Sequence, residues 1–112
     1  MTTTTTLSWE AKRTSETQRV EELLQQHFQQ ADAYRYNSGS IRVRVIDPQF
    51  EGMSREQRDA MVEPHLDMLP PETLRDIMTL FTFAPSDLNR TPTTLRQNML
   101  NTEFEDPSPS ML

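Results

Sequence analysis

The chain has 112 residues, a formal net charge of −6 and a hydrophobic content of 34%, which leave room for one domain with a small core. The absence of cysteine excludes disulfides, thiolate catalysis and cysteine-held zinc or iron–sulfur clusters within this chain. No apolar run approaches the roughly 18 residues of a membrane span, and the N-terminus lacks the apolar core of a secretory signal, so we expect a cytoplasmic protein without membrane contact.

Residues 1–14 are predicted to form a disordered arm, because five consecutive threonines carry no periodicity and Trp9 is an isolated apolar residue. Docking of Trp9 on the domain or on a partner is the alternative. A helix is expected to begin at Ser15, since Ser15 and Gln18 have the spacing of a capping box. The apolar stripe of this helix consists of Val20, Leu23, Leu24, His27, Phe28 and Ala31.

Two strands are predicted next, because the apolar period changes from helical to two. Residues 32–37 alternate, with Tyr34 and Tyr36 on one side, and residues 41–45 alternate apolar side chains with arginines. The polar residues 37–40 between them have the composition of a tight turn. The two strands should therefore form a hairpin.

A second helix is expected from Ser54, which is followed three residues later by a glutamine suited to a capping box. Pro64 removes one backbone hydrogen bond, so we expect a kink or an early end there. A short helix restarts after Pro70, and residues 78–83 form the third strand. Residues 89–112 are predicted to be a flexible tail with room for one short helix.

These elements predict a single small α+β domain over residues 15–88. Their order is α-β-β-α-α-β, and a hairpin followed by a helical crossover gives a three-stranded mixed sheet with helices on one face.

The segment from Phe50 to Arg58, Phe-Glu-Gly-Met-Ser-Arg-Glu-Gln-Arg, resembles the signature of the BolA family, whose fold is akin to the second type of KH domain. The similarity extends over residues 15–88. Asp59 and Asp76 depart from the pattern, since they stand where the family usually carries histidine. An aspartate at such a position replaces a neutral nitrogen ligand and titrating switch by a hard, anionic oxygen.

BolA proteins commonly bind a monothiol glutaredoxin and share a [2Fe–2S] cluster with it, through a histidine before the third strand and sometimes a ligand from the hairpin loop. In this chain Asp76 and the loop residues Asn37 and Ser38 supply neither imidazole nor thiolate, so we expect no cofactor and no cluster sharing in the usual manner. An apo complex with a glutaredoxin, or with another protein, does not require that ligand. The resemblance thus implies a non-catalytic interaction or regulatory module, whose partner surface is the groove around Asn37, Ser38, Arg58, Asp59 and Asp76.

A KH-like nucleic-acid-binding or transcription-regulatory domain is the alternative. If Tyr34 and Tyr36 face the helices, then Arg35, Arg42 and Arg44 share the open face of the hairpin and can contact phosphates. Nucleic acid is nevertheless disfavoured, because the net charge is negative and the chain lacks the Gly-x-x-Gly loop of KH domains.

Catalysis is not expected. Asp59, Glu63 and Asp76 offer carboxylates, but no nucleophile–base pair, phosphate loop or metal-ligand spacing accompanies them. The predicted site therefore includes no catalytic and no metal-binding residue, and the sequence leaves the identity of the partner and the oligomeric state open.

Overall fold

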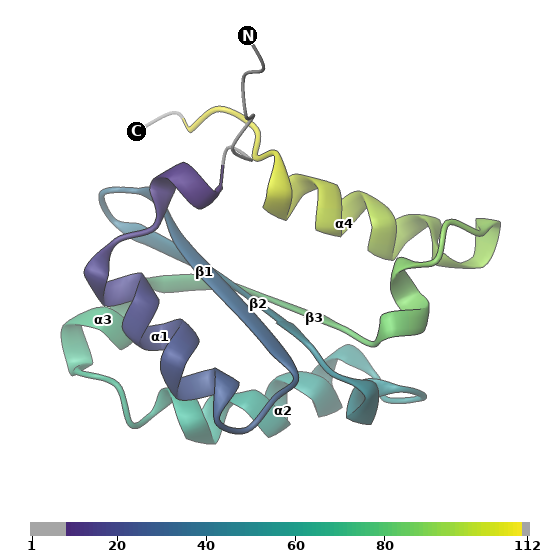
Figure 1. The fold of residues 1–112 in the computed structure, drawn as a ribbon, viewed down its shortest axis with the longest axis horizontal. Helices are drawn as coiled ribbons and strands as arrows, with labels where there is room; N and C mark the ends of the chain where they lie inside the picture. The colour runs from purple at the N-terminus through teal and green to yellow at the C-terminus, as the bar shows by residue number, and fades with distance from the viewer. Residues whose placement is uncertain (1–8, 111–112) are drawn as a thin grey trace, which may run out of the picture.

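Three strands form one mixed sheet with β2 in the middle (Figure 1). β1 (Gln30–Asn37) pairs antiparallel with β2 (Ser40–Ile46), and β2 pairs parallel with β3 (Ile77–Phe83). The computed structural model describes residues 9–110. The predicted α+β class and the three-stranded mixed sheet are confirmed.

One face of the sheet is covered by helices α1 (Ser15–Gln25) and α2 (Arg55–Leu66), while α3 (Pro71–Asp76) leads into β3 (Figure 1). Because side chains alternate along a strand, the hairpin turns every second, apolar residue toward these helices. The buried core on this face consists of Val20, Leu24, Phe28, Ala31, Ala33, Ile41, Val43, Val45, Phe50, Val62, Leu66, Leu69 and Ala84.

Both long helices on this face begin with a reciprocal capping box, which satisfies backbone N–H groups that a helix start leaves without partners. In α2 the box joins Ser54 and Gln57, as predicted. In α1 it joins Thr14 and Thr17, one residue earlier than predicted. The loop before α2 contains Gly52 with a φ of 73°, a conformation that other residues rarely adopt.

Helix α2 passes through Pro64 and ends at Leu66, two residues later. Proline lacks the N–H that would bond the carbonyl of Ala60, so the helix ends soon afterwards, in agreement with the expected early end. Within residues 9–110, no helix is both long and apolar enough to cross a membrane.

The opposite face of the sheet carries helix α4 (Leu95–Glu105), away from α1 and α2 (Figure 1). Its Phe104 is buried, and the ring centroid lies 4.9 Å from that of Tyr34 and 5.5 Å from that of Phe81. This corrects the prediction of a flexible tail for residues 89–110, while residues 111 and 112 lie outside the described residues. The short helix is present, but it packs on the domain as a second layer, because Phe104 and its neighbours supply apolar cover for the sheet.

Trp9 belongs to the same aromatic cluster, which we define as Trp9, Tyr34, Phe81, Phe83 and Phe104. The Trp9 side chain is buried, with its ring centroid 5.5 Å from that of Phe104. The prediction of a disordered arm is corrected from Trp9 onward, since the partners of this tryptophan come from distant parts of the chain. The rest of the predicted arm, residues 1–8, lies outside the described residues.

Candidate functional site

One end of the sheet brings the hairpin turn and the entrance of β3 together. Arg35 joins them, because it donates to the Ser38 carbonyl at 3.0 Å and to the Asp76 carboxylate at 2.9 Å. Arg35 also pairs with Glu16 of α1. Burial acts to lower the pKa of Arg35, but the hydrogen bonds to Asp76 and Glu16 outweigh it, so the pKa is raised. Asn37, Ser38 and Asp76 therefore lie in one neighbourhood, as predicted.

The donor set at this end does not fit an iron–sulfur cluster. Asp76 offers a carboxylate that already accepts a hydrogen bond from Arg35, and Asn37 and Ser38 offer an amide and a hydroxyl. Cluster iron is ordinarily held by thiolate or imidazole. The ligand role that the BolA resemblance implies for this position is not supported by these side chains.

Arg58 lies near the other end of β3. Its guanidinium donates to the carbonyls of Met53 and Thr82 at 3.0 and 3.2 Å and to the Asp87 carboxylate at 2.6 Å. Thr82 is six residues beyond Asp76, which corresponds to roughly 20 Å of extended chain. The predicted single groove containing Arg58 and Asp76 is therefore corrected: Arg58 fastens the loop before α2 to the end of β3, away from Asp76.

Asp59 sits between these two regions, on α2. Its side chain is 25% exposed, the buried Oδ1 has no hydrogen-bond partner within residues 9–110, and Arg55 is 3.8 Å away. Burial raises the pKa of Asp59, Arg55 opposes the rise, and Glu63 adds to it.

Replacing Asp59 with asparagine is expected to raise the free energy of unfolding at neutral pH by about 0.5–1 kcal/mol, less than the ~1–3 kcal/mol of a fully buried unpaired group. A raised pKa means that ionisation destabilises the fold, and this penalty appears as the pH rises from the ordinary value of 3.8 through the raised pKa. The gain in the free energy of unfolding should therefore disappear below pH 3.8, which urea unfolding at a series of pH values measures. Asp67→Asn, at the exposed C-cap of the same helix, is the control, and an equal gain at low pH would contradict the assignment.

The three hairpin arginines do not share a face. The register places Arg42 opposite Tyr34 and Arg35 opposite Ile41, and directly opposed residues lie on the same side of a sheet. Arg42 and Arg44 are therefore under α4, and Arg35 is on the α1 side. The predicted open arginine face is corrected, because the tyrosines point toward α4 and the arginines alternate with apolar residues that face α1 and α2.

Arg42 and Arg44 are also paired with carboxylates, mostly from α4. Arg42 contacts Glu103 at 3.2 Å, and Arg44 contacts Asp32 at 2.7 Å and Glu105 at 2.8 Å. Burial acts to raise the pKa of Glu103, but hydrogen bonds from Ser108 and Arg42 outweigh it and lower the pKa. These arginines hold α4 on the sheet.

His27 and His65 are brought together at the far end of α1 and α2. Their rings stack with centroids 3.9 Å apart and an interplanar angle of 22°. The part of the chain that the structure describes contains no group of three or more His, Cys, Asp or Glu side chains that could hold a metal ion. Two stacked imidazoles alone fall short of the four ligands of a structural zinc site.

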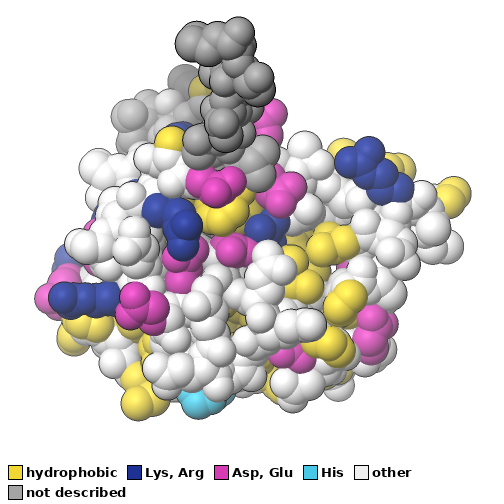
Figure 2. All heavy atoms as spheres, viewed as in Figure 1, with side chains coloured by type: hydrophobic (Ala, Val, Ile, Leu, Met, Phe, Trp, Pro, Cys, Tyr) yellow, Lys and Arg dark blue, Asp and Glu magenta, His cyan; other side chains and the backbone are white. Residues whose placement is uncertain are grey.

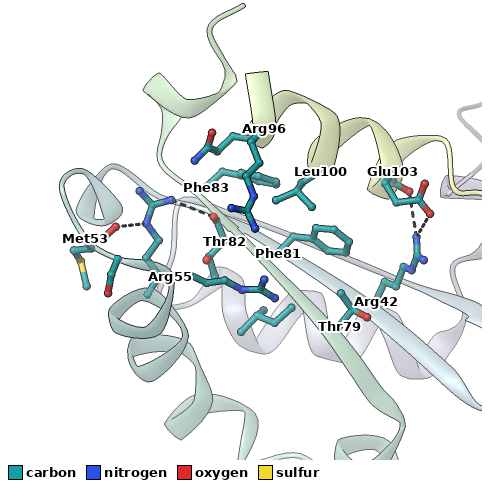
Figure 3. Close-up of a pocket in the computed structure, with 14 residues that line it drawn as sticks. Arg42, Met53, Arg55, Thr79, Phe81, Thr82, Phe83, Arg96, Leu100 and Glu103 are labelled. Carbon is teal, nitrogen blue, oxygen red and sulfur yellow. Dashed lines mark hydrogen bonds and ion pairs between the residues drawn. The ribbon is translucent and has the colours of Figure 1, made fainter. Parts of the chain in front are cut away.

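A groove runs between α4 and the outer edge of β3, and we call it the α4-side groove (Figure 3). Its volume is about 630 Å³. Phe81 and Leu100 give it an apolar floor and wall. Figure 2 shows hydrophobic side chains reaching the surface between α4 and α2. Four arginines line it: Arg42, Arg55, Arg58 and Arg96.

Two of these arginines are available to a ligand. Arg42 and Arg58 are engaged in the contacts described above, whereas Arg96 has no ion pair within residues 9–110 and Arg55 has only the 3.8 Å contact with Asp59. Figure 3 shows Arg96 reaching from α4 and Arg55 from α2 toward the same stretch of β3. Two guanidinium groups that converge on one strand form a site suited to anionic side chains.

Neither Arg55 nor Arg96 was among the predicted site residues. Arg96 lies in the segment predicted to be a tail. The position of β3 at the edge of the sheet depends on the path of the chain after α3, and no local sequence pattern predicts that path. The spacing of Leu95, Met99 and Leu100 was the only available signal that a helix follows the third strand.

Comparison of the chain with protein-family models, with curated proteins and with solved structures finds no match. The roles of its residues therefore have to be argued from their geometry.

Proposed function

We propose that this protein is a non-catalytic interaction module of BolA-like fold that binds an extended segment of a partner protein along the outer edge of β3. The observation that carries the proposal is the open backbone at Leu80, beside a groove with an apolar floor and two available arginines. Adding a strand to an exposed sheet edge is a recurrent mode of peptide recognition, in which backbone hydrogen bonds give affinity and side-chain pockets give specificity.

The direction of the backbone groups follows from two hydrogen bonds. The Phe83 carbonyl accepts from the Asp47 N–H at 3.0 Å, on the β2 side, while the Thr82 carbonyl accepts from Arg58, on the outer side. Because these groups alternate along a strand, the N–H and C=O of Leu80 point outward like those of Thr82. No hydrogen bond from outside the sheet reaches Leu80 within residues 9–110.

The open segment is short. Arg58 covers the edge at Thr82, and a bulge interrupts the pairing at Met78, since Ile77 and Thr79 oppose consecutive residues of β2. A short added strand forms few backbone bonds, so the side chains of the partner have to supply much of the affinity. The grooves beside β3 are therefore central to the proposal.

The KH-like nucleic-acid alternative draws no support from Arg35, Arg42 and Arg44. Each pairs with at least one carboxylate of the fold, and such pairing reduces the positive potential that a phosphate backbone requires.

Replacing Leu80 with proline tests strand addition, because proline removes the outward N–H and is tolerated on edge strands. We expect the wild type to enrich extended peptides from a library of random eight-residue sequences, and Leu80→Pro to lose this enrichment. Leu80→Val, which keeps the N–H, is the matched control. Trp9 fluorescence confirms that both variants are folded. If the folded proline variant enriches peptides as strongly as the wild type, the proposal is wrong.

A monothiol glutaredoxin is the first natural partner to test, because the BolA resemblance names it. We expect any complex with it to form in the apo state, without the visible absorbance of a [2Fe–2S] cluster. Size-exclusion chromatography with absorbance detection measures both properties. A coloured complex of the wild type would contradict the loss of the cluster site, and Asp76→His shows whether an imidazole restores it.

A further inference from the structure

We infer that the partner segment carries acidic and basic side chains at alternate positions, an inference that rests on the proposed strand addition at β3. The charges expected on the partner segment follow from the side chains that line the two grooves beside this strand. One groove offers the available Arg96, the other offers the carboxylates of Glu63 and Asp67, and Arg55 borders both.

The second groove lies on the opposite side of β3, and we call it the α2-side groove. Its volume is about 560 Å³. Asp59, Glu63 and Asp67 of the α2 region line it together with Arg55, opposite Met78 and Leu80. Glu63 and Asp67 are exposed, one helical turn apart, and no ion pair engages either of them in the part of the chain that the structure describes.

β3 lies between the grooves and belongs to both. Thr79 and Leu80 line the α4-side groove as well as the α2-side groove. A strand added at Leu80 continues the sheet, so its side chains project alternately to the α4 side and to the α2 side. Side chains directed to the α4 side meet Arg96, and the intervening ones meet Glu63 and Asp67, while Arg55 borders both grooves. Cross-strand pairs of opposite charge are favourable, and like charges in opposition are unfavourable.

This charge arrangement favours a protein segment over the other occupants of the edge. A nucleic acid carries negative charge along its whole backbone, so the carboxylates of the α2-side groove repel part of it. A second copy of the chain, pairing antiparallel through β3, keeps the two α4 sides on the same side of the continuous sheet. Its Arg55 and Arg96 then lie beside those of the first copy, where like charges oppose each other.

Four eight-residue peptides test the inference by NMR titration of the intact protein. The first alternates glutamate with lysine, and the second has the same composition in two blocks, four glutamates followed by four lysines. The third alternates glutamate with threonine, and the fourth alternates lysine with threonine. We expect the alternating glutamate–lysine peptide to bind most tightly and to shift the amide resonances of Leu80 and Thr82, with the block peptide weaker by about threefold or more.

Two variants separate the grooves. Arg96→Ala is expected to weaken the glutamate–threonine peptide about threefold and to leave the lysine–threonine peptide unchanged, and Glu63→Gln is expected to do the reverse. If the alternating and block peptides bind with equal affinity and the amide resonance of Leu80 still shifts, the proposed charge pattern is wrong and strand addition remains supported. Absence of any shift at Leu80 with all four peptides would overturn strand addition itself. Tighter binding of a single-stranded oligonucleotide at the same residues would overturn both in favour of nucleic acid.

Discussion

Replacing Arg44 with methionine is expected to lower the free energy of unfolding by about 3 kcal/mol, the lower end of the range for removing one partner of a buried ion pair. The Arg44 side chain is 4% exposed and lies at the centre of the middle strand. Its guanidinium contacts the carboxylates of Asp32 and Glu105 and packs 4.5 Å from the ring centroid of Phe104. Methionine preserves much of the packing volume but removes the cation that contacts both carboxylates. Urea unfolding followed by circular dichroism measures the change.

Arg75→Met is the matched control for this substitution. Arg75 is 78% exposed and its nearest carboxylate, on Asp76, is 3.9 Å away, so the expected change is within about 0.5 kcal/mol. Adding Asp32→Asn to Arg44→Met removes one unpaired charge and should recover part of the lost stability. If the double variant is no more stable than Arg44→Met, the loss comes from packing and the role assigned to the ion pair is wrong.

Replacing Phe104 with alanine is expected to lower the free energy of unfolding by about 3–4 kcal/mol, the range for emptying a buried phenylalanine site. Phe104 is 0% exposed and contacts Trp9, Tyr34 and Phe81. It also receives the Tyr34 hydroxyl hydrogen bond on its backbone carbonyl at 2.8 Å. Since Trp9 is the only tryptophan of the chain, its fluorescence reports directly on this cluster. The emission should shift to longer wavelength as the ring becomes hydrated.

Met99→Ala on the same helix is the control, because Met99 is 64% exposed and alanine favours a helix. Its effect should remain within about 0.5 kcal/mol, with unchanged Trp9 emission. Unchanged emission in Phe104→Ala would show that Trp9 is not held by α4 and would contradict the packing of the second layer.

The central domain could be predicted because its signals are local. The helical stripe predicted beyond Gln25 was wrong, because α1 ends there and Ala31 lies in β1. The capping residues at Ser54, the alternation in β2 and the stripe from Val20 to Leu24 each lie within one element. Each therefore points to a single structure without knowledge of distant contacts. The resulting α+β sheet with α1 and α2 on one face agrees with the structure, but the prediction of helices on one face alone is wrong, because α4 covers the other face.

The second layer could not be predicted, because its stabilising contacts are distant in sequence. Phe104 has few apolar neighbours on its own helix, and the aromatic rings that bury it, Tyr34, Phe81 and Trp9, come from other elements. The position of the hairpin arginines was misjudged for a related reason. The register that opposes Arg42 to Tyr34 puts both on one face, where α4 covers them.

The candidate site was predicted in part. Asp76, Asn37 and Ser38 come together because a hairpin turn and the start of the parallel third strand meet at the same end of the sheet. Arg58 is separated from them by most of the length of β3, and Asp59 lies between the two regions. The available arginines, Arg55 and Arg96, emerge only when the edge strand and the docked helix are both in place.

The contact between Trp9 and Phe104 closes a loop that spans nearly the whole chain. Forming such a contact early in folding would sacrifice the conformational freedom of every residue between its ends. The hairpin and its helices, whose contacts are closer in sequence, can assemble before it. We therefore expect the emission of Trp9 to follow a late event in folding, the docking of the two ends of the chain on a sheet that has already formed.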